Sequence, residues 1–423
     1  MAESDKYLAS QWEAPHMDVQ AIRKDFPVLR TVEGATPLVY LDSACQTLRP
    51  RQVTEAVSEY YTTCPACAGR SVHRMSTEVT LRCDEVRGKA ARFVGAADPS
   101  EVAFVKNATE ALNTVILGSG LRKGQLVVTT DHEHNSVNIP VIHATRTMGV
   151  RRITVGSTPE GTFDLERFKE VMSKEVGLVA MCLTSNVTGH TIPARDIIDI
   201  AHSQGAKVLL DAAQAAPSAP LDVRALDVDY LAASVHKMLG PSGVGLMYVR
   251  SDLSNQLAPV MYGGHAVQEA TDADFELLPS PERFEAGLQN YSGIFGAGAA
   301  LDYLSELGLD EVRAHERVLN RRLTSAASDI PGVSVVGPSD PDARAGIFSF
   351  NAAGLSPHDI AMILDSSKNI AIRSGMHCCH AFFNAMALKG CARVSMYIYN
   401  TEAEVDYFAQ SLSDLVGRIG HRS

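Results

Sequence analysis

Between about residues 100 and 250, short apolar runs alternate with amphipathic segments of about ten or more residues, which is the pattern of βαβ units. The runs are rich in Val, Leu and Ile without strict alternation, as expected for strands that helices cover on both faces. This alternation predicts an α/β fold with a mostly parallel, doubly wound sheet. The runs are Val102–Val105, Leu126–Thr130, Arg152–Val155, Gly177–Leu183, Lys207–Asp211, Tyr230–Ala233 and Val244–Val249.

The pattern changes beyond about residue 305, where a second, smaller α+β domain is predicted. It contains a long charged helix, two strand-like pieces and a closing helix, at Leu309–Asp329, Val333–Val336, Gly346–Phe350 and Glu402–Ile419. We therefore predict a large domain over residues 38–304 and a small domain over 305–423. The segment 1–37 is expected to pack with the small domain.

Net charge, hydropathy and cysteine content limit the partners and the cellular location expected for the chain. The net charge of −11 argues against a nucleic-acid-binding face or an attraction to membranes. No apolar stretch approaches the roughly 18 residues of a membrane span, and residues 1–12 do not resemble a secretory leader. Eight cysteines in 423 residues are too sparse for a disulfide framework and are expected to be reduced thiols. Together these features predict a cytoplasmic protein.

Residues just past the strand ends are the ones that a doubly wound fold directs at a ligand. Asp211 closes one predicted strand, and Lys237 follows the next one. This pair suits pyridoxal phosphate (PLP), in which a lysine binds the cofactor covalently and an acid pairs with the pyridinium nitrogen. Taken alone, each could instead be a solvated surface charge.

Other groups near strand ends strengthen this interpretation. Asn107, Ala108 and Thr109 open a helix, where free backbone N–H groups and a hydroxyl bind phosphate well. Ser234 and His236 flank the lysine and could add contacts to the phosphate. The imidazole of His132 is expected to stack on the flat cofactor ring, although a histidine at a strand end is often an ordinary hydrogen-bonded residue.

A second group of residues suggests sulfur chemistry. Cys378 lies between histidines in the segment 373–380, and a lowered pKa would make it a nucleophilic thiolate. The alternatives are a small buried hydrophobe, or soft metal ligation together with the Cys64–Cys67 pair. Arg373 and Arg393 lie on either side of this segment, and either could hold an amino-acid carboxylate.

An ordered set of motifs resembles the group II (SufS-type) cysteine desulfurases and selenocysteine lyases, within the class V aminotransferase group of fold-type I PLP enzymes. The similarity runs from about Phe26 to Leu415. The motifs are Tyr40–Ala44, Asn107–Glu110, Thr184–Gly189, Asp211–Gln214, Ser234–Lys237, Arg283–Gly287, Arg373–Cys378 and Tyr399–Thr401.

The resemblance implies a role for each matching position. Lys237 would bind the cofactor, Asp211 would pair with its pyridinium nitrogen, and Gln214 would donate to its ring hydroxyl. His132 would stack on the ring and transfer protons, while Asn186 and Arg393 would orient the substrate carboxylate and Cys378 would carry the persulfide. The phosphate would be held by Thr109, Ser234 and His236.

The implied activity is the conversion of L-cysteine to L-alanine, with sulfur passed to an acceptor protein (SufE- or SufU-like) or a scaffold for iron–sulfur assembly or thiolation. The resemblance also implies a homodimer. A selenocysteine lyase or a C–S lyase of the same fold is an alternative. A more remote one is a metal- or iron–sulfur-binding scaffold with a degenerate PLP site.

The chain departs from the family pattern at several positions. Leu288 replaces a threonine expected to reach a partner subunit's phosphate, Gly69 replaces a histidine, and Met376 replaces the first of two histidines before Cys378. Cysteines that the pattern does not require stand at 45, 64, 67 and 379. For the Cys64–Cys67 pair, metal binding, sulfur relay and no special chemistry all remain open.

Overall fold

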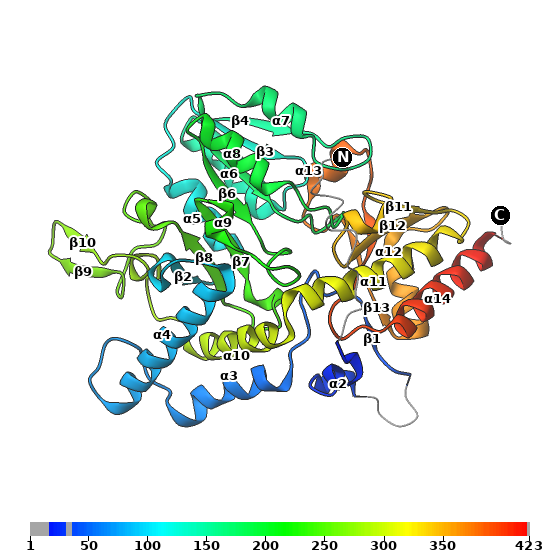
Figure 1. Ribbon diagram of the computed structural model, residues 1–423, viewed down its shortest axis with the longest axis horizontal. Coiled ribbons are helices and arrows are strands. Elements are labelled where there is room, and N and C mark those ends of the chain that lie inside the picture. The colour runs from blue at the N-terminus through cyan, green and yellow to red at the C-terminus, as the bar shows by residue number, and fades with distance from the viewer. Residues whose placement is uncertain (1–16, 31–35, 421–423) are drawn as a thin grey trace.

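The seven predicted strands form one sheet in the structure, a computed structural model that describes residues 17–30 and 36–420 (Figure 1). Across the sheet the order is β2-β8-β7-β6-β5-β3-β4. β8 runs antiparallel to β2 and β7, and the other pairs are parallel. Their bounds are β2 Val102–Val105, β3 Leu126–Thr130, β4 Arg151–Val155, β5 Val176–Cys182, β6 Lys207–Asp211, β7 Tyr230–Ser234 and β8 Gly245–Val249.

Helices cover both faces of this sheet, as the unalternating apolar runs predict. Val127 and Leu209 pack on one side against α5 and α6, while Val128 and Leu210 pack on the other with α4, α8 and α10. Successive side chains of a strand point to opposite faces, so a strand with two covered faces must be apolar throughout. The bounds are α4 Arg74–Val94, α5 Ala108–Gly118, α6 Asn135–Thr147, α8 Ala194–Ser203 and α10 Tyr291–Leu307.

The small antiparallel sheet has the order β11-β12-β15-β14 and packs with α11, α12 and α14 (Figure 1). The predicted long helix, both strands and the closing helix are confirmed to within about two residues, the uncertainty of any helix end. The bounds are α11 Leu309–Ser328, β11 Val333–Val335, β12 Ile347–Ala352, α12 Pro357–Lys368, β14 Arg373–Gly375, α13 His380–Ala385, β15 Cys391–Ser395 and α14 Glu402–Gly420.

The N-terminal segment contacts both halves of the chain. Arg23, which ends α2 (Val19–Arg23), forms an ion pair of 2.7 Å with Glu404 of α14. Asp25 accepts a hydrogen bond of 3.0 Å from Tyr303 of α10. β1 (Val39–Tyr40) pairs in parallel with β13 (Ile370–Ala371). The predicted domain boundaries stay predictions, and residues 1–16 lie outside the described part.

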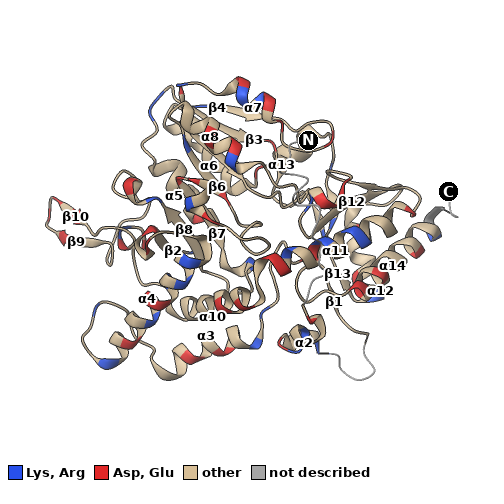
Figure 2. Ribbon diagram, viewed as in Figure 1, with Lys and Arg blue, Asp and Glu red and all other residues tan. Residues whose placement is uncertain are grey.

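The remaining helices and strands belong to the large-sheet half, with α3 packed against α10 and β9 paired with β10 in a hairpin. They are α3 Arg51–Thr63, α7 Leu165–Val171, α9 Val223–Leu226, β9 Val267–Ala270 and β10 Phe275–Leu277. Acidic and basic side chains are interspersed along outer helices such as α4 and α11 (Figure 2). Within the described ranges, every helix is too short or too polar to cross a membrane.

Candidate active site

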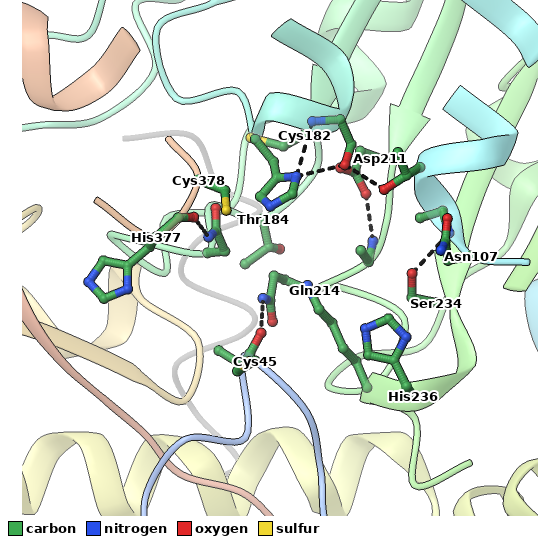
Figure 3. A pocket seen from close by; sticks show the side chains of 18 of the residues that line it. Cys45, Asn107, Cys182, Thr184, Asp211, Gln214, Ser234, His236, His377 and Cys378 are labelled. Carbon is green, nitrogen blue, oxygen red and sulfur yellow. Dashed lines mark hydrogen bonds between the residues drawn. The ribbon is translucent and has the colours of Figure 1, made fainter. Parts of the chain in front are cut away.

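A pocket lies at the carboxyl ends of the central strands, and both halves of the chain line it (Figure 3). Ser234 and Lys237 come from the end of β7, whereas Cys378 and Arg393 come from the small-domain side. The structure therefore brings residues more than a hundred positions apart to one site. The predicted residues that line it are Asn107, Ala108, Thr109, Asn186, Asp211, Gln214, Ser234, His236, Lys237, Arg373, Cys378 and Arg393.

Lys237 and Asp211 share this pocket because β6 and β7 are parallel neighbours that end at the same sheet edge. Asp211 is buried, and its Oδ1 accepts a hydrogen bond of 3.0 Å from the N–H of Ala213. Burial raises the pKa of Asp211 and lowers the pKa of Lys237, and each is opposed by the other's charge. A buried acid with spare acceptor capacity suits a protonated ring nitrogen.

The first turn of α5 forms the part of the wall beside Ser234. Asn107 caps the helix by accepting a 3.1 Å hydrogen bond from the N–H of Glu110, and the N–H of Ala108 donates to Ser234 Oγ at 2.9 Å. Thr109 Oγ1 hydrogen-bonds Ser136 Oγ at 2.7 Å. N–H groups of a first helical turn have no partner within the helix, so this wall suits a phosphate.

Gln214 and His236 also line the pocket. Gln214 Nε2 donates to the carbonyl of Ala44 at 2.8 Å, which orients the amide beside Cys45 (Figure 3). Burial, together with the charge of Lys237, lowers the pKa of His236 to about 4, so its imidazole is neutral near pH 7. A neutral imidazole can still donate one hydrogen bond to an anion.

His132 is absent from the pocket wall, which contradicts the position predicted for it. Its ring packs on Phe382 at a centroid distance of 4.9 Å, and its Nε2 lies 2.5 Å from Ser157 Oγ. The turn after β3 is held by Glu133, whose carboxylate accepts hydrogen bonds from Thr130 and from the N–H of Cys182. This anchoring turns residue 132 away from the strand ends.

His134, two residues later, lines the pocket instead. It caps α6, and its Nδ1 accepts a hydrogen bond of 3.1 Å from the N–H of Ser136. This leaves Nε2 as the protonated nitrogen of the neutral ring. Burial lowers the pKa of His134 to about 4, with the charge of Lys237 adding to the effect.

The cysteine loop carries two successive residues in the left-handed region, His377 at φ 47° and Cys378 at φ 58°. Asn186 Nδ2 donates to the carbonyl of His377 at 2.8 Å, and the N–H of Asn135 donates to the carbonyl of Cys378 at 2.7 Å. Cys379 Sγ donates to Asn186 Oδ1 at 2.8 Å. Large-domain groups thus hold the loop, and Cys378 is exposed while Cys379 is fully buried.

His377 differs from the expectation that flanking histidines activate Cys378. Its Nε2 lies 3.1 Å from the carbonyl of Cys391, and in Figure 3 its ring points away from the Cys378 sulfur. Burial lowers the pKa of His377 to about 3, so this ring is neutral near pH 7. His377 therefore fixes the loop and supplies no positive charge to the thiol.

Two arginines close the small-domain side of the pocket. Arg393 is buried, and it donates to Asp42 Oδ1 and to the carbonyl of Asn186, both at 2.9 Å. Within residues 17–30 and 36–420, its Nε has no hydrogen-bond partner. Arg373 contacts the sulfur of Cys45. Both guanidinium groups remain suited to a carboxylate, whereas the Asn186 amide is engaged with the cysteine loop.

Further lining residues were not predicted as site residues. These are Ala44, Cys45, His134, Ser136, Cys182, Thr184, Ala213 and His377. Cys182 and Thr184 stand at the carboxyl end of β5, so the strand-end rule could have identified them. Ser136 and His134 belong to a helix start whose exact position no sequence pattern fixes.

The Cys64–Cys67 pair lies outside this pocket, in the connection between α3 and α4. Cys64 is buried and Cys67 is partly exposed. Across the described ranges, no three His, Cys, Asp or Glu side chains gather in a way that could hold a metal ion. The structure therefore gives no support to a metal centre formed by these two thiols.

A doubly wound sheet that presents a lysine and a carboxylate from neighbouring strand ends defines the class of fold-type I PLP enzymes. The chain matches the aminotransferase class-V family over residues 39–408. A probable cysteine desulfurase of Synechocystis sp. is 38% identical over 395 residues, which cover 92% of this chain and 94% of that protein. The chain therefore belongs to the class-V aminotransferase family.

Solved structures agree with this assignment. An apo cysteine desulfurase from Thermococcus onnurineus superposes with a TM-score of 0.89 at 34% identity, covering 96% of this chain and 99% of that one. The protein C-DES, solved with glycine covalently linked to its PLP cofactor, superposes with a TM-score of 0.80 at 22% identity, covering 93% of this chain and 99% of that one. The second likeness shows the fold alone.

Proposed function

We propose that this protein is a PLP-dependent cysteine desulfurase that converts L-cysteine to L-alanine and keeps the sulfur as a persulfide on Cys378. The observation that carries the proposal is that Lys237 and Cys378, from opposite sides of the domain junction, line one pocket. The similarity to cysteine desulfurases over more than nine-tenths of the chain supports it.

The residues present fit PLP. Asp211 is a buried acid with one backbone donor on Oδ1, the start of α5 lines the pocket through Asn107–Thr109, and Lys237 provides an amine whose pKa burial lowers. When bound, PLP supplies the electron sink that makes the Cα–H and Cβ–S bonds of cysteine breakable.

The chain's own groups would bind cysteine and move its protons. Arg393 would pair with the substrate carboxylate, since Asp42 and the carbonyl of Asn186 already fix its guanidinium. Lys237 Nζ, with a lowered pKa, would take the Cα proton and return protons to the carbon frame. His134 would stack on the ring and assist through Nε2, the place first predicted for His132.

Cys378 would supply the nucleophile. Its thiolate would attack the substrate sulfur, so that an S–S bond forms as the Cβ–S bond breaks and the electron pair returns to the substrate's carbon frame. Protonation at Cβ and Cα then gives alanine. Because Cys378 is exposed, an acceptor protein approaching from solvent could reach the terminal sulfur of the persulfide.

Further proposals concern the setting of the enzyme. An acceptor of the SufE or SufU type, or a scaffold, would receive the sulfur for iron–sulfur assembly or thiolation. A cytoplasmic location is consistent with eight free thiols.

We also propose a homodimer, because exposed apolar side chains gather on the large domain, among them Met261, Tyr262, Phe275 and Leu288.

The test is to incubate the purified holoenzyme with L-cysteine and quantify alanine and sulfide. We expect alanine from the wild type and none above background from Lys237→Ala. A wild-type enzyme that binds PLP yet forms no alanine from cysteine would overturn the proposal.

A further inference from the structure

A second cavity, of about 460 Å³, lies between the two halves of the chain. It is lined by the segment after β5, the segment before α9, the first half of α11 and the residues that precede β12. Thr184 lines both this cavity and the active-site pocket, so the two are neighbours. A volume of this size matches sites for metabolite-sized ligands, which typically occupy about 300–1,000 Å³.

Arg344 is the most unusual residue of the cavity wall. Its side chain is buried, with 2% of the residue exposed, and its Nη2 donates to Thr324 Oγ1 at 2.5 Å. In the part of the chain that the structure describes, Nε and Nη1 have no hydrogen-bond partner. Burial lowers the pKa of Arg344 to about 10, still far above neutrality, so the guanidinium is charged. A buried charge without its partners is costly to fold, which points to an absent counter-ion.

Two groups near Arg344 favour its charged form, the exposed carboxylate of Asp340 and the ring of Phe348, whose centroid lies 5.3 Å from the guanidinium carbon. Among the described residues, neither of them gives Nε or Nη1 a hydrogen bond. Asp342 is held by two hydrogen bonds of 2.6 Å from Arg321. Glu316 accepts hydrogen bonds from Ser218 Oγ and from the N–H of Gly346, and burial raises its pKa to about 8. Glu316 is therefore largely uncharged near pH 7. Arg313, exposed on α11, adds positive charge at the rim.

The rest of the wall combines basic and polar side chains, among them Arg195 and His190, with apolar ones, among them Ile192, Leu221 and Leu226. A bare inorganic ion would leave this apolar surface unused. We infer that the cavity binds a small organic anion, whose carboxylate or phosphate head pairs with Arg344 and whose apolar body packs on Ile192 and Leu221. This site is separate from the cysteine pocket and does not rest on the proposed reaction.

The test is isothermal titration calorimetry of PLP-saturated holoenzyme with phenyl phosphate, with benzoate and with neutral benzyl alcohol. We expect saturable binding of at least one of the two anions and none of benzyl alcohol. The preferred anion shows which head group the site takes. PLP saturation keeps phenyl phosphate out of the cofactor's phosphate position.

Variants locate the binding. Arg344→Gln should weaken binding of the preferred anion by about tenfold or more, as expected for loss of a charged hydrogen bond worth at least about 1.4 kcal/mol. Arg313→Glu changes an exposed residue and should weaken anion binding several-fold. This second variant keeps the test available if Arg344→Gln does not fold. Arg146→Glu, at an exposed position of α6, is the matched charge control and should leave binding unchanged. Absence of saturable anion binding, or binding equal in wild type and both cavity variants, would overturn the inference.

Discussion

At the residue scale, the backbone of the cysteine loop is held in an uncommon conformation. His377 and Cys378 both have positive φ, which costs of the order of 1–3 kcal/mol for each residue that is not glycine. Hydrogen bonds from Asn186 and Asn135 to the two carbonyls offset this cost. The strained backbone thus persists because large-domain groups hold the loop through several hydrogen bonds. This loop conformation places the Cys378 thiol at the pocket.

His134 gives the first prediction at this scale. Because it lines the pocket with a neutral ring, His134→Ala should lower kcat for alanine formation by about 100-fold, a typical contribution of a general acid–base group. His132→Gln is the matched control, since its ring lies outside the pocket, and it should keep kcat within about threefold. Equal losses in the two variants, at equal PLP absorbance, would argue against this assignment.

The two histidines also show where sequence reasoning stops. The strand-end rule correctly directs attention to residues 131–135, and it correctly places Asp211 and Lys237 in one pocket. It cannot choose between side chains two positions apart. That choice depends on Glu133, whose bonds to Thr130 and Cys182 set the turn. The bond to Cys182 reaches the neighbouring strand β5, and sequence spacing does not reveal it.

At the element scale, one buried ion pair fixes helix α4 against the edge of the large sheet. Arg87 donates to Glu285 at 2.6 and 3.0 Å and to the carbonyl of Val102 at 2.8 Å. Glu285 in turn accepts from the N–H of Phe104 in β2. Helix, edge strand and the segment before α10 are therefore joined through one carboxylate.

Arg87→Met should lower the free energy of unfolding by about 3–5 kcal/mol, because Glu285 would remain buried without its cation. Chemical denaturation of the variant measures this loss. Arg167→Met, which breaks the exposed pair with Glu170, is the control and should cost no more than about 1 kcal/mol. A loss as small for residue 87 as for residue 167 would contradict the structural role given to the buried pair.

The sequence predicts the seven strands well because most of them are apolar runs; the edge strand β4, which begins with two arginines, is the exception. The β9–β10 hairpin was not predicted, and its strands are mostly exposed with acidic residues at positions 269 and 276. Such strands carry no burial pattern, and their pairing has to be found in three dimensions.

At the scale of the whole molecule, residues from the two halves of the chain meet in the active-site pocket. The large domain supplies Lys237 and Asp211, and the small-domain side supplies Cys378 and Arg393. The hydrophobic pattern beyond residue 305 predicts the helices and strands there but gives no angle between the two halves. The N-terminal segment bridges the two halves, because Arg23 pairs with Glu404 of α14 while Asp25 accepts a hydrogen bond from Tyr303 of α10.

The proposed homodimer gives a prediction at this scale. Tyr262 and Phe275 are more than half exposed, and their rings lie 5.7 Å apart on the large domain. Sedimentation velocity should show a dimer for the wild type and a shift toward monomer for Phe275→Glu. Met362→Glu, an equally exposed change on α12, should keep the dimer. A monomeric wild type would contradict the proposal.

The most direct measurement is to locate the sulfur after a single turnover. Holoenzyme is mixed with L-cysteine, alkylated at once, digested and analysed by mass spectrometry, while alanine is quantified in the same sample. We expect one extra sulfur atom on the peptide that contains Cys378, in step with alanine. Cys378→Ala should retain PLP absorbance and form neither product, whereas Cys67→Ala should behave as the wild type. A persulfide on Cys379 or Cys45, or undiminished alanine from Cys378→Ala, would contradict the role proposed for Cys378.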